Sequence, residues 1–455
     1  MSNSNDRVNF GSRIGAILAS AGSAVGLGNI WRFPYETGNH GGAAFILLYL
    51  VCILVMGLPI MIAEFSIGRH SRANTAGSYK ALAPKSAWQG IGYMGVLAGF
   101  LILSFYSVVA GWTLEYTWQA VANNLTDKTP DEFATLFTTF SQDPWRPMLW
   151  MVVFMIMTHV IIIMGVKKGI EQSSKIMMPM LFVLILVLVG CSLSLPDAEK
   201  GLTFLFKPDF SKLNPDVFLG AMGQAFFSLS LGLGCLSTYA SYFGKDTNLG
   251  KTAASVAVID TMVAIMAGVI IFPAAFSVGI SPDAGPSLLF ITLPNVFQMA
   301  FADMPLLAYV LSIMFYILLA LAAFTSTISM HEVVTAFVNE EWKVPRKRAA
   351  VYVTLGCITL GVLASLSFGP LNDFKILGLS IFDFLDSLTS KVMLPLGGML
   401  ISIFTGWKLE QRIVWDEISN GGKLKVPLFK LYVFILKYVA PIAIGLIFVN
   451  ELGLF

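Results

Sequence analysis

The stretch Gly22–Pro34 holds the residues of this sequence that are best suited to bind ions or a small polar ligand. Three glycines fall within seven residues of an apolar run, and each costs a helix interior about 1 kcal/mol relative to alanine, which favours unwinding. In hydrocarbon, an unwound backbone is tolerated where it is buried or lines a cavity, and its free carbonyls can then coordinate a cation. The alternative is a close helix-packing seam. Asn29 and Arg32 favour a binding site, because both are costly to bury beside a seam.

The elements that position this stretch are predicted to be membrane-spanning helices. The chain has 455 residues, of which 56% are hydrophobic and 12% are charged, a composition typical of a polytopic membrane protein. We expect an all-α fold of eleven transmembrane helices, each an apolar segment of about 20 residues or more. The predicted spans are 13–37, 42–69, 90–122, 147–165, 169–194, 216–242, 250–278, 302–338, 347–368, 375–405 and 428–452.

Loop charges predict the orientation of these spans. Lysine and arginine predominate between spans 2 and 3, 4 and 5, and 8 and 9, whereas four acids face one lysine between spans 3 and 4. The positive-inside rule therefore predicts a cytoplasmic N-terminus and an extracellular C-terminus in the plasma (inner) membrane. We expect no signal peptide, because no cleavage-like site precedes the first span.

Composition excludes several other classes of function. The sequence has no basic cluster of the kind that binds nucleic acids. We expect the lipid bilayer to surround the protein, and the sequence indicates no obligate protein partner. The cysteines lie scattered in apolar spans and predict neither a disulfide nor a metal site: Cys52, Cys191, Cys235 and Cys357. We do not expect an enzyme, because the histidines are too dispersed to form a catalytic constellation: His40, His70, His159 and His331.

A second interrupted span mirrors the first. Gln224–Gly234, in predicted span 6, is apolar at both ends and has glycines and hydroxyls at its centre. Span 6 comes five spans after span 1, an odd number, so the two spans enter the membrane from opposite sides. This pairing predicts a 5+5 inverted repeat, 12–195 and 216–405, with its binding site at the midplane. Residues 428–452 form an extra helix, and 1–455 is one transporter domain.

An ordered set of motifs resembles the neurotransmitter:sodium symporter family, whose members have the leucine-transporter fold. The set comprises Gly22–Pro34, Gly41–Phe45, Gly57–Pro59 with Glu64, and Ser230–Gly234. The resemblance covers nearly the whole chain, and the short outer loops are similar to those of the bacterial branch. It implies a sodium-coupled symporter that imports hydrophobic or aromatic L-amino acids by alternating access, with two Na⁺ per substrate.

The resemblance also implies two sodium sites built from oxygen atoms, the ligands that hard cations prefer. The first comprises the Ala24 carbonyl, Asn29, Ser228, Asp260 and the substrate carboxylate. The second comprises the carbonyls of Gly22 and Val25 together with Ala322, Thr325 and Ser326. Hydroxyls in membrane helices usually donate a hydrogen bond to their own helix. Thr325 and Ser326 are therefore interpreted as sodium ligands only because the first span also matches the family.

Asp260 stands where the family pattern has an amide. Animal members balance the sodium charge partly with chloride, near the positions of Tyr49, Gln224 and Ser228. A permanent carboxylate at Asp260 predicts transport that does not need chloride. The alternative is a protonated, hydrogen-bonded acid.

Gly26 determines the substrate class that the resemblance implies. Relatives that carry monoamines have an aspartate there, so glycine leaves room for the carboxylate of an α-amino acid, which backbone N–H groups and the Tyr106 hydroxyl would receive. Leu233 stands where an aromatic ring is frequent, which leaves space for a bulky apolar side chain. The implied substrate site comprises Ala24, Gly26, Gly28, Ile102, Tyr106, Phe227, Ser228, Ser230, Leu233, Ser326, Ser329 and Met330. Taken alone, each of these residues is more typical of an ordinary core position than of a binding site.

Two charged pairs resemble the family's gates. Arg32 and Asp386 match the outer pair, roofed by Tyr106 and Phe227. The inner pair is Arg7 and Glu340, with Phe10 where the pattern has tryptophan. Glu332, seven residues beyond Thr325, has no partner that the sequence identifies.

The fifth predicted span, 169–194, is called helix 5 below. Its Gly169 and Pro179 are separated by nine residues, a spacing that also occurs in this family. Proline removes a helical hydrogen bond and glycine lowers the cost of unwinding, so this segment is expected to open a water path to the second sodium site. The alternative is a proline kink without a role in transport. Two further functions remain at this point: a non-transporting amino-acid sensor of the same fold, and an ion channel, since midplane carbonyls also build selectivity filters.

Overall fold

The computed structural model describes residues 8–126, 128–278 and 288–451, and the regular structure within them is helical. Nine helices of this part are long and apolar enough to cross a bilayer, and a bent pair makes a tenth. The nine are α3–η2–α4 (Ala43–Ser71), α6 (Gln89–Val121), α8 (Arg146–Ile163), η3–α9 (Val166–Leu193), α13 (Leu249–Ser277), α15 (Pro305–Glu341), α16 (Arg346–Leu366), α17–η6–α18–η7 (Ile381–Lys408) and α20–η8–α21 (Phe429–Asn450).

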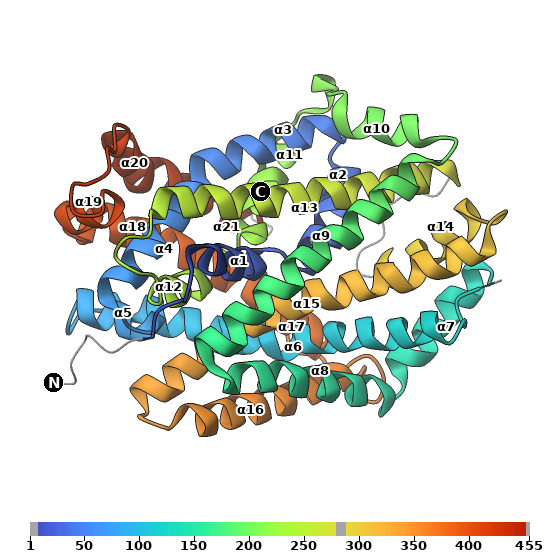
Figure 1. Ribbon diagram of the computed structural model, residues 1–455, viewed down its shortest axis with the longest axis horizontal. Helices are drawn as coiled ribbons and strands as arrows, with labels where there is room; N and C mark the ends of the chain where they lie inside the picture. The colour runs from blue at the N-terminus through green and yellow to red at the C-terminus, as the bar shows by residue number, and fades with distance from the viewer. Residues whose placement is uncertain (1–7, 127, 279–287, 452–455) are drawn as a thin grey trace.

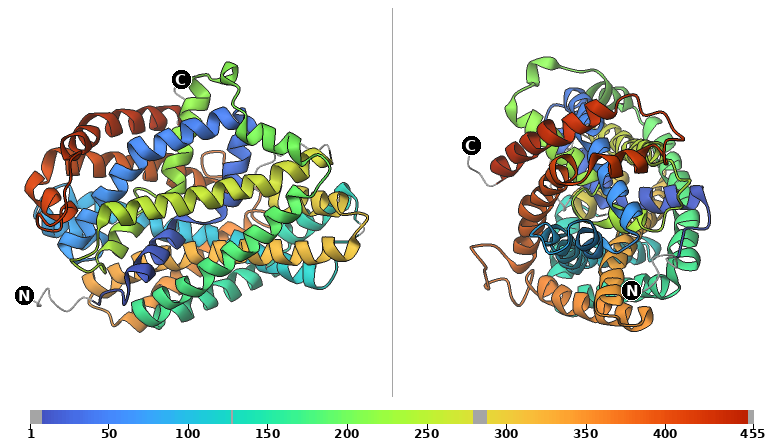
Figure 2. Two further views of the ribbon diagram at one scale, coloured as in Figure 1. Left: turned by 45° about the horizontal axis from the view of Figure 1, so that its top comes forward. Right: turned by 90° about the vertical axis from the view of Figure 1, so that its left-hand side faces the viewer.

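These helices form one bundle whose long axis runs across Figure 1. Helices α6, α9, α13 and α15 extend from one end of the bundle to the other, and Figure 2 shows the bundle end on. The N-terminal end carries α5 (Thr75–Leu82) and α19 (Gln411–Ile418). Three short helices lie at the opposite end: α7 (Pro130–Gln142), α10 (Ala198–Phe206) and α14 (Leu293–Ala300).

The side of the bundle is strongly apolar. Leu149 on α8 and Ile176 and Val183 on α9 each leave 61% of their surface exposed. A soluble protein rarely exposes so many large apolar side chains together. The long apolar helices and this surface are those of an integral membrane protein.

The first helix breaks where the glycines of Gly22–Pro34 predict. Helix α1 (Arg13–Ala24) and η1–α2 (Gly28–Asn39) are bent by 55° about the residues between them. The Ser12 side chain caps α1 by accepting the Gly15 N–H at 3.0 Å. Small residues on α1 allow it to pack closely against α9, α13 and α15.

Predicted span 6 is likewise divided, into α11 (Pro215–Ser228) and α12 (Cys235–Ala240). The six residues between them form turns, with a positive φ at Ser230 (52°), Gly232 (83°) and Gly234 (82°). A Cβ on Gly232 would lie 2.6 Å from the Leu394 carbonyl oxygen, so this position needs glycine for its conformation and for space.

Most span boundaries agree with the sequence prediction to within a few residues. The main exception is predicted span 10, which was expected to begin at residue 375, whereas α17 begins at Ile381. Residues 369–379 form turns and an isolated bridge between Ile376 and Leu379, and Ser380 caps the helix by accepting the Asp383 N–H at 3.1 Å. Apolar composition alone therefore extended the prediction into a loop.

Candidate substrate and ion sites

A cavity of about 310 Å³ lies between the breaks of the two divided helices. It contains eleven of the twelve residues predicted for the substrate: Ala24, Gly26, Gly28, Ile102, Tyr106, Phe227, Ser228, Ser230, Leu233, Ser326 and Met330. Ser329 does not line it, since its hydroxyl donates to the Ser326 carbonyl at 2.8 Å. The cavity therefore assembles residues from four segments that are far apart in the sequence.

One end of the cavity is polar and is formed by the break in the first helix. The Leu27 N–H donates to the Tyr106 hydroxyl oxygen at 3.2 Å, which leaves the tyrosine proton available to an acceptor. A Cβ on Gly26 would lie 2.5 Å from the Ser326 hydroxyl oxygen and 3.4 Å from that of Tyr106. The absence of a side chain at Gly26 thus lets the two hydroxyl groups approach the backbone closely. Ile102, Leu233 and Met330 add apolar side chains to the lining.

Three of the residues predicted for the first sodium site, Asn29, Ser228 and Asp260, lie together beside the cavity. The fully buried Asp260 carboxylate accepts the Asn29 amide at 2.6 Å and the Ser228 hydroxyl at 2.7 Å, and Tyr49 lies 3.5 Å away. The Asn29 side-chain oxygen accepts the Gly26 N–H at 2.9 Å, so it faces the helix break. A cation there needs the Asn29 amide to turn its oxygen toward the carboxylate. With that rotation, the donor set fits Na⁺.

The second predicted set joins the first helix to α15. The Thr325 and Ser326 hydroxyls both lie 3.2 Å from the Val25 carbonyl oxygen, and Thr325 also lies 3.0 Å from the Ala322 carbonyl oxygen. Gly22 is adjacent, because a Cβ placed on it would come 3.3 Å from Thr325. These oxygen atoms come together from two helices. A set of carbonyl and hydroxyl oxygens without sulfur or imidazole ligands fits a small hard cation.

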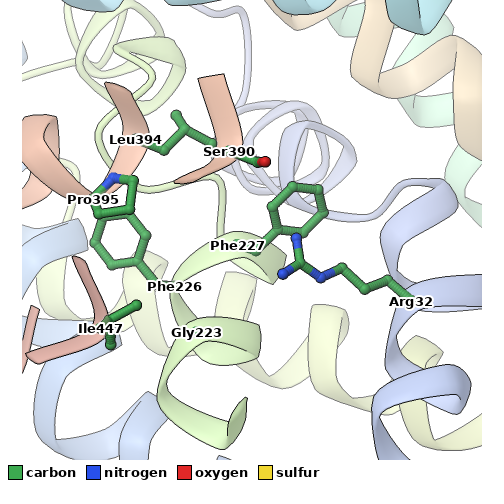
Figure 3. A pocket seen from close by; sticks show the side chains of 8 residues that line it. All are labelled: Arg32, Gly223, Phe226, Phe227, Ser390, Leu394, Pro395 and Ile447. Atoms are coloured by element: carbon green, nitrogen blue, oxygen red, sulfur yellow. The ribbon is translucent and has the colours of Figure 1, made fainter. Parts of the chain in front are cut away.

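The predicted outer gate residues lie above the polar end of the cavity. The Arg32 Nε is 3.7 Å from the Glu36 carboxylate. The Arg32 guanidinium carbon stands 4.2 Å from the centre of the Phe227 ring (Figure 3). A second, much smaller cavity of about 10 Å³ separates this pair from Ser390 and Leu394. Asp386 lines the central cavity. Phe227 therefore lies between the central cavity and the arginine.

The N-terminal end of the bundle is closed by aromatic packing. Phe10 contacts the rings of Tyr239 and Tyr242 edge-on at 5.9 Å, and its N–H donates to the Tyr242 carbonyl at 3.0 Å. Glu340 accepts the Asn74 N–H at 2.8 Å. Its predicted partner Arg7 lies outside the described residues. The smaller phenyl ring thus still closes this end where the family pattern has an indole.

One exposed ion pair also joins α1 to the loop before α13. Arg13 lies 2.7 Å from Asp246, and this hydrogen bond lowers the pKa of the Asp246 carboxyl from its ordinary value. Both side chains are about 70% exposed, so water screens the pair and its contribution to stability is small.

Helix 5 is wound in this conformation. Gly169 lies in the π-helical segment η3 (Val166–Glu171), and Pro179 lies inside α9 (Gln172–Leu193). A Cβ on Gly169 would run into the Ile161 carbonyl, so the glycine also allows close packing on α8. Both readings of the glycine and proline, the unwinding element and the simple kink, are compatible with this arrangement.

The partners of Glu332 could not be found from the sequence. Its buried carboxylate accepts two hydrogen bonds from Arg346, at 2.9 and 2.5 Å, and one from the Tyr242 hydroxyl at 2.7 Å. The sequence also missed part of the cavity wall, namely Trp31, Phe105, Val109, Phe382, Asp383, Thr389 and Ser390. Asp383 stands one helical turn before the predicted gate residue Asp386. This spacing places both aspartates on the same face of the helix, and it could have indicated that Asp383 also lines the cavity.

A helical membrane bundle with two broken helices facing one central cavity is the architecture of a secondary transporter, not of an enzyme. The chain belongs to the sodium:neurotransmitter symporter family, whose family model matches residues 7–135 and 138–454. The protein is therefore a sodium-dependent transporter and an integral membrane protein.

Individual relatives match along nearly the whole chain. The uncharacterised sodium-dependent transporter YhdH of Bacillus subtilis is 38% identical, with 98% of each chain covered. An uncharacterised sodium-dependent transporter of Haemophilus influenzae is 34% identical, with 99% of each covered. The crystal structure of MhsT in complex with L-phenylalanine has a TM-score of 0.89 and 46% identity, and covers 98% of this chain and 100% of that one.

Proposed function

We propose that the protein is a symporter that imports hydrophobic or aromatic L-amino acids together with two sodium ions. The observation that carries this proposal is the central cavity, whose lining combines polar groups at the helix break with the apolar side chains of Ile102, Leu233 and Met330. That asymmetry suits a zwitterion with an apolar side chain. The structural relative MhsT was crystallised with L-phenylalanine, which supports the same substrate class.

The polar end receives the substrate carboxylate in this proposal. The Tyr106 hydroxyl donates to it, and Gly26, which lines the cavity without a side chain, lets it lie next to the first cation. In this proposal the twelve predicted substrate residues form the substrate site, and the two predicted sets of oxygen ligands each bind one sodium ion. Ser329 contributes indirectly, by its hydrogen bond to Ser326. The substrate carboxylate then completes the coordination of the first sodium ion, which couples the binding of one to the other.

Alternating access uses the two ends of the bundle. Arg32 and Asp386 close the outer end over Phe227, whereas Arg7 and Glu340 close the cytoplasmic end beside Phe10. Unwinding of helix 5 between Gly169 and Pro179 opens the path by which sodium leaves the second site. The eleven spans, the 5+5 inverted repeat, the cytoplasmic N-terminus and the plasma-membrane location belong to the same proposal.

Removing sodium tests this function directly. With a potential of 100 mV, two sodium ions contribute about 4.6 kcal/mol, and a tenfold gradient adds about 1.4 kcal/mol per ion. Together they support accumulation of roughly 10⁵-fold. We expect proteoliposomes with a sodium gradient to accumulate labelled leucine or phenylalanine, and sodium-free vesicles not to. Undiminished uptake without sodium contradicts the proposal, and sodium-dependent binding without accumulation identifies a sensor instead.

Replacing Leu233 by phenylalanine tests the apolar wall. Leu233 is 5% exposed and lines the cavity, so a larger ring reduces the space left for the substrate side chain. Overfilling costs about 1–3 kcal/mol, so we expect phenylalanine and tryptophan to lose roughly tenfold more affinity than leucine. Competition binding in proteoliposomes measures this, with Leu97→Phe on the exposed surface as the matched control. Equal losses for all three substrates show that Leu233 does not contact the side chain.

A further inference from the structure

Glu171 links two helices through a carboxylate that is almost fully buried. It belongs to η3 at the start of helix 5 and is 3% exposed. Its Oε2 accepts the Gly11 N–H at 2.5 Å and its Oε1 accepts the Ser12 hydroxyl at 2.9 Å, both from the N-terminal end of α1. Lys175, one turn along α9, also donates to Oε1 at 2.6 Å. Three donors from two helices thus meet on one carboxylate.

The end of α1 is shaped to receive this carboxylate. A Cβ on Gly11 would lie 3.3 Å from the Glu171 Oε2, and a Cβ on Gly15 would overlap the glutamate side chain. Ser12 caps α1 while its own proton goes to Glu171, so the carboxylate also lies at the positive end of the helix dipole. Any displacement of this end of α1 must therefore break the contacts with Glu171.

The backbone of helix 5 is irregular on both sides of Lys175. Glu171 lies in a π-helical segment, and Pro179 gives no N–H to the Lys175 carbonyl. The ion pair of Lys175 with Glu171 spans the turn that precedes this missing hydrogen bond. Loss of that turn moves Glu171 and Lys175 together.

The same helix also reaches the second predicted sodium site. A Cβ on Gly22 would meet the Met178 sulfur at 3.5 Å and Thr325 at 3.3 Å. Met178 lies two turns after Glu171 on α9. A rearrangement between these residues thus reaches both the end of α1 and the wall of the cation site.

We propose that Glu171 is a positioning residue of the transport cycle, which latches the N-terminal end of α1 to helix 5 while the cytoplasmic side is closed. Unwinding of helix 5 withdraws the carboxylate from Gly11 and Ser12, and α1 is then free to swing away from the second sodium site. This role rests on the proposed symport, because a release step gives the latch its purpose. It adds a specific link between the helix 5 segment and the first helix.

Glu171→Gln tests the latch, because it keeps the size of the side chain and removes its charge. Hydrogen–deuterium exchange of the full-length protein in lipid nanodiscs, in sodium and in potassium, is the main measurement. Since hydrogen bonds to a charged group are stronger than those to a neutral one, we expect exchange in residues 10–18 and 168–178 to rise about tenfold. Exchange across α13 and α16 is expected to stay unchanged, whereas a general folding defect raises it there too.

A double-mutant cycle isolates the contact itself. Ser12→Ala removes both the cap of α1 and the donor to Glu171, and its effect on exchange is expected to be smaller in the Glu171→Gln background than in the wild type. Glu410→Gln is the matched control, since it removes an exposed carboxylate from the residue just before α19, a helix at the N-terminal end of the bundle (Figure 1). Additive effects, or wild-type exchange in Glu171→Gln, overturn the latch. These measurements need no substrate, so they decide the latch separately from the sodium-dependent uptake that tests symport.

Discussion

Replacing Gly26 by aspartate is expected to abolish binding of leucine and phenylalanine. The new Cβ would lie 2.5 Å from the Ser326 hydroxyl oxygen, and its carboxylate would occupy the space assigned to that of the substrate. Two unpaired carboxylates in one buried site cost about 3–5 kcal/mol, so affinity is expected to fall by at least about 10²-fold to 10³-fold. Equilibrium binding of labelled leucine in saturating sodium measures the loss.

Gly26→Asn separates charge from size in the same position. The asparagine fills the same volume without the charge, so it is expected to bind amino acids better than Gly26→Asp does. Phenethylamine lacks a carboxylate, so it is expected to bind the Gly26→Asp variant more tightly than the Gly26→Asn variant. It is also expected to bind the Gly26→Asp variant more tightly than phenylalanine does. Unchanged leucine affinity in Gly26→Asp rejects the position proposed for the substrate carboxylate.

Asp260→Asn is expected to make transport depend on chloride or to abolish coupling to sodium. Asp260 is fully buried beside Asn29 and Ser228, and in the proposed function it supplies the negative charge of the first cation site. Without that charge, two sodium ions enter a low-dielectric site with the substrate carboxylate alone. Leaving buried charge uncompensated costs about 3–5 kcal/mol, so uptake in chloride-free medium is expected to fall by about 10²-fold or more.

The surroundings of Asp260 suit a replacement anion. Gln224 stands one turn before Ser228 on α11, and neither polar atom of its amide has a hydrogen-bond partner among the described residues. Uptake with sodium chloride compared with sodium gluconate measures the effect, and Asp209→Asn, on an exposed loop, is the control. Asp260→Asn uptake equal to the wild type in gluconate contradicts the charge-balance role.

Local composition was sufficient to predict the membrane helices and the two breaks. Apolar runs marked the long spans, and glycines at 22–28 and 230–234 marked the positions where the first and sixth spans are interrupted. These signals are strong because an unwound backbone in a membrane needs glycine and polar neighbours, and few other structures do. The eleven cavity residues, however, followed from the family resemblance, since Ile102 or Met330 alone is an ordinary apolar residue.

Long-range polar pairs could not be predicted, because they depend on how the helices pack. Glu171 lies about 160 residues from its partners on α1, and nothing local to it identifies Gly11 or Ser12. Loop boundaries failed for a different reason. The turns before Ile381 are nearly as apolar as a span, so hydropathy alone does not end the predicted segment there.

The buried pair of Glu332 and Arg346 constrains how this protein can evolve. Glu332 has no exposed surface and both of its oxygens are held by Arg346, so loss of Arg346 leaves a buried carboxylate without its counter-ion, at a cost of about 3–5 kcal/mol. Replacement of both by apolar residues of similar volume is far less costly. Substitutions at the two positions are therefore expected to be inherited together, and a descendant that has lost one without the other needs a compensating change nearby.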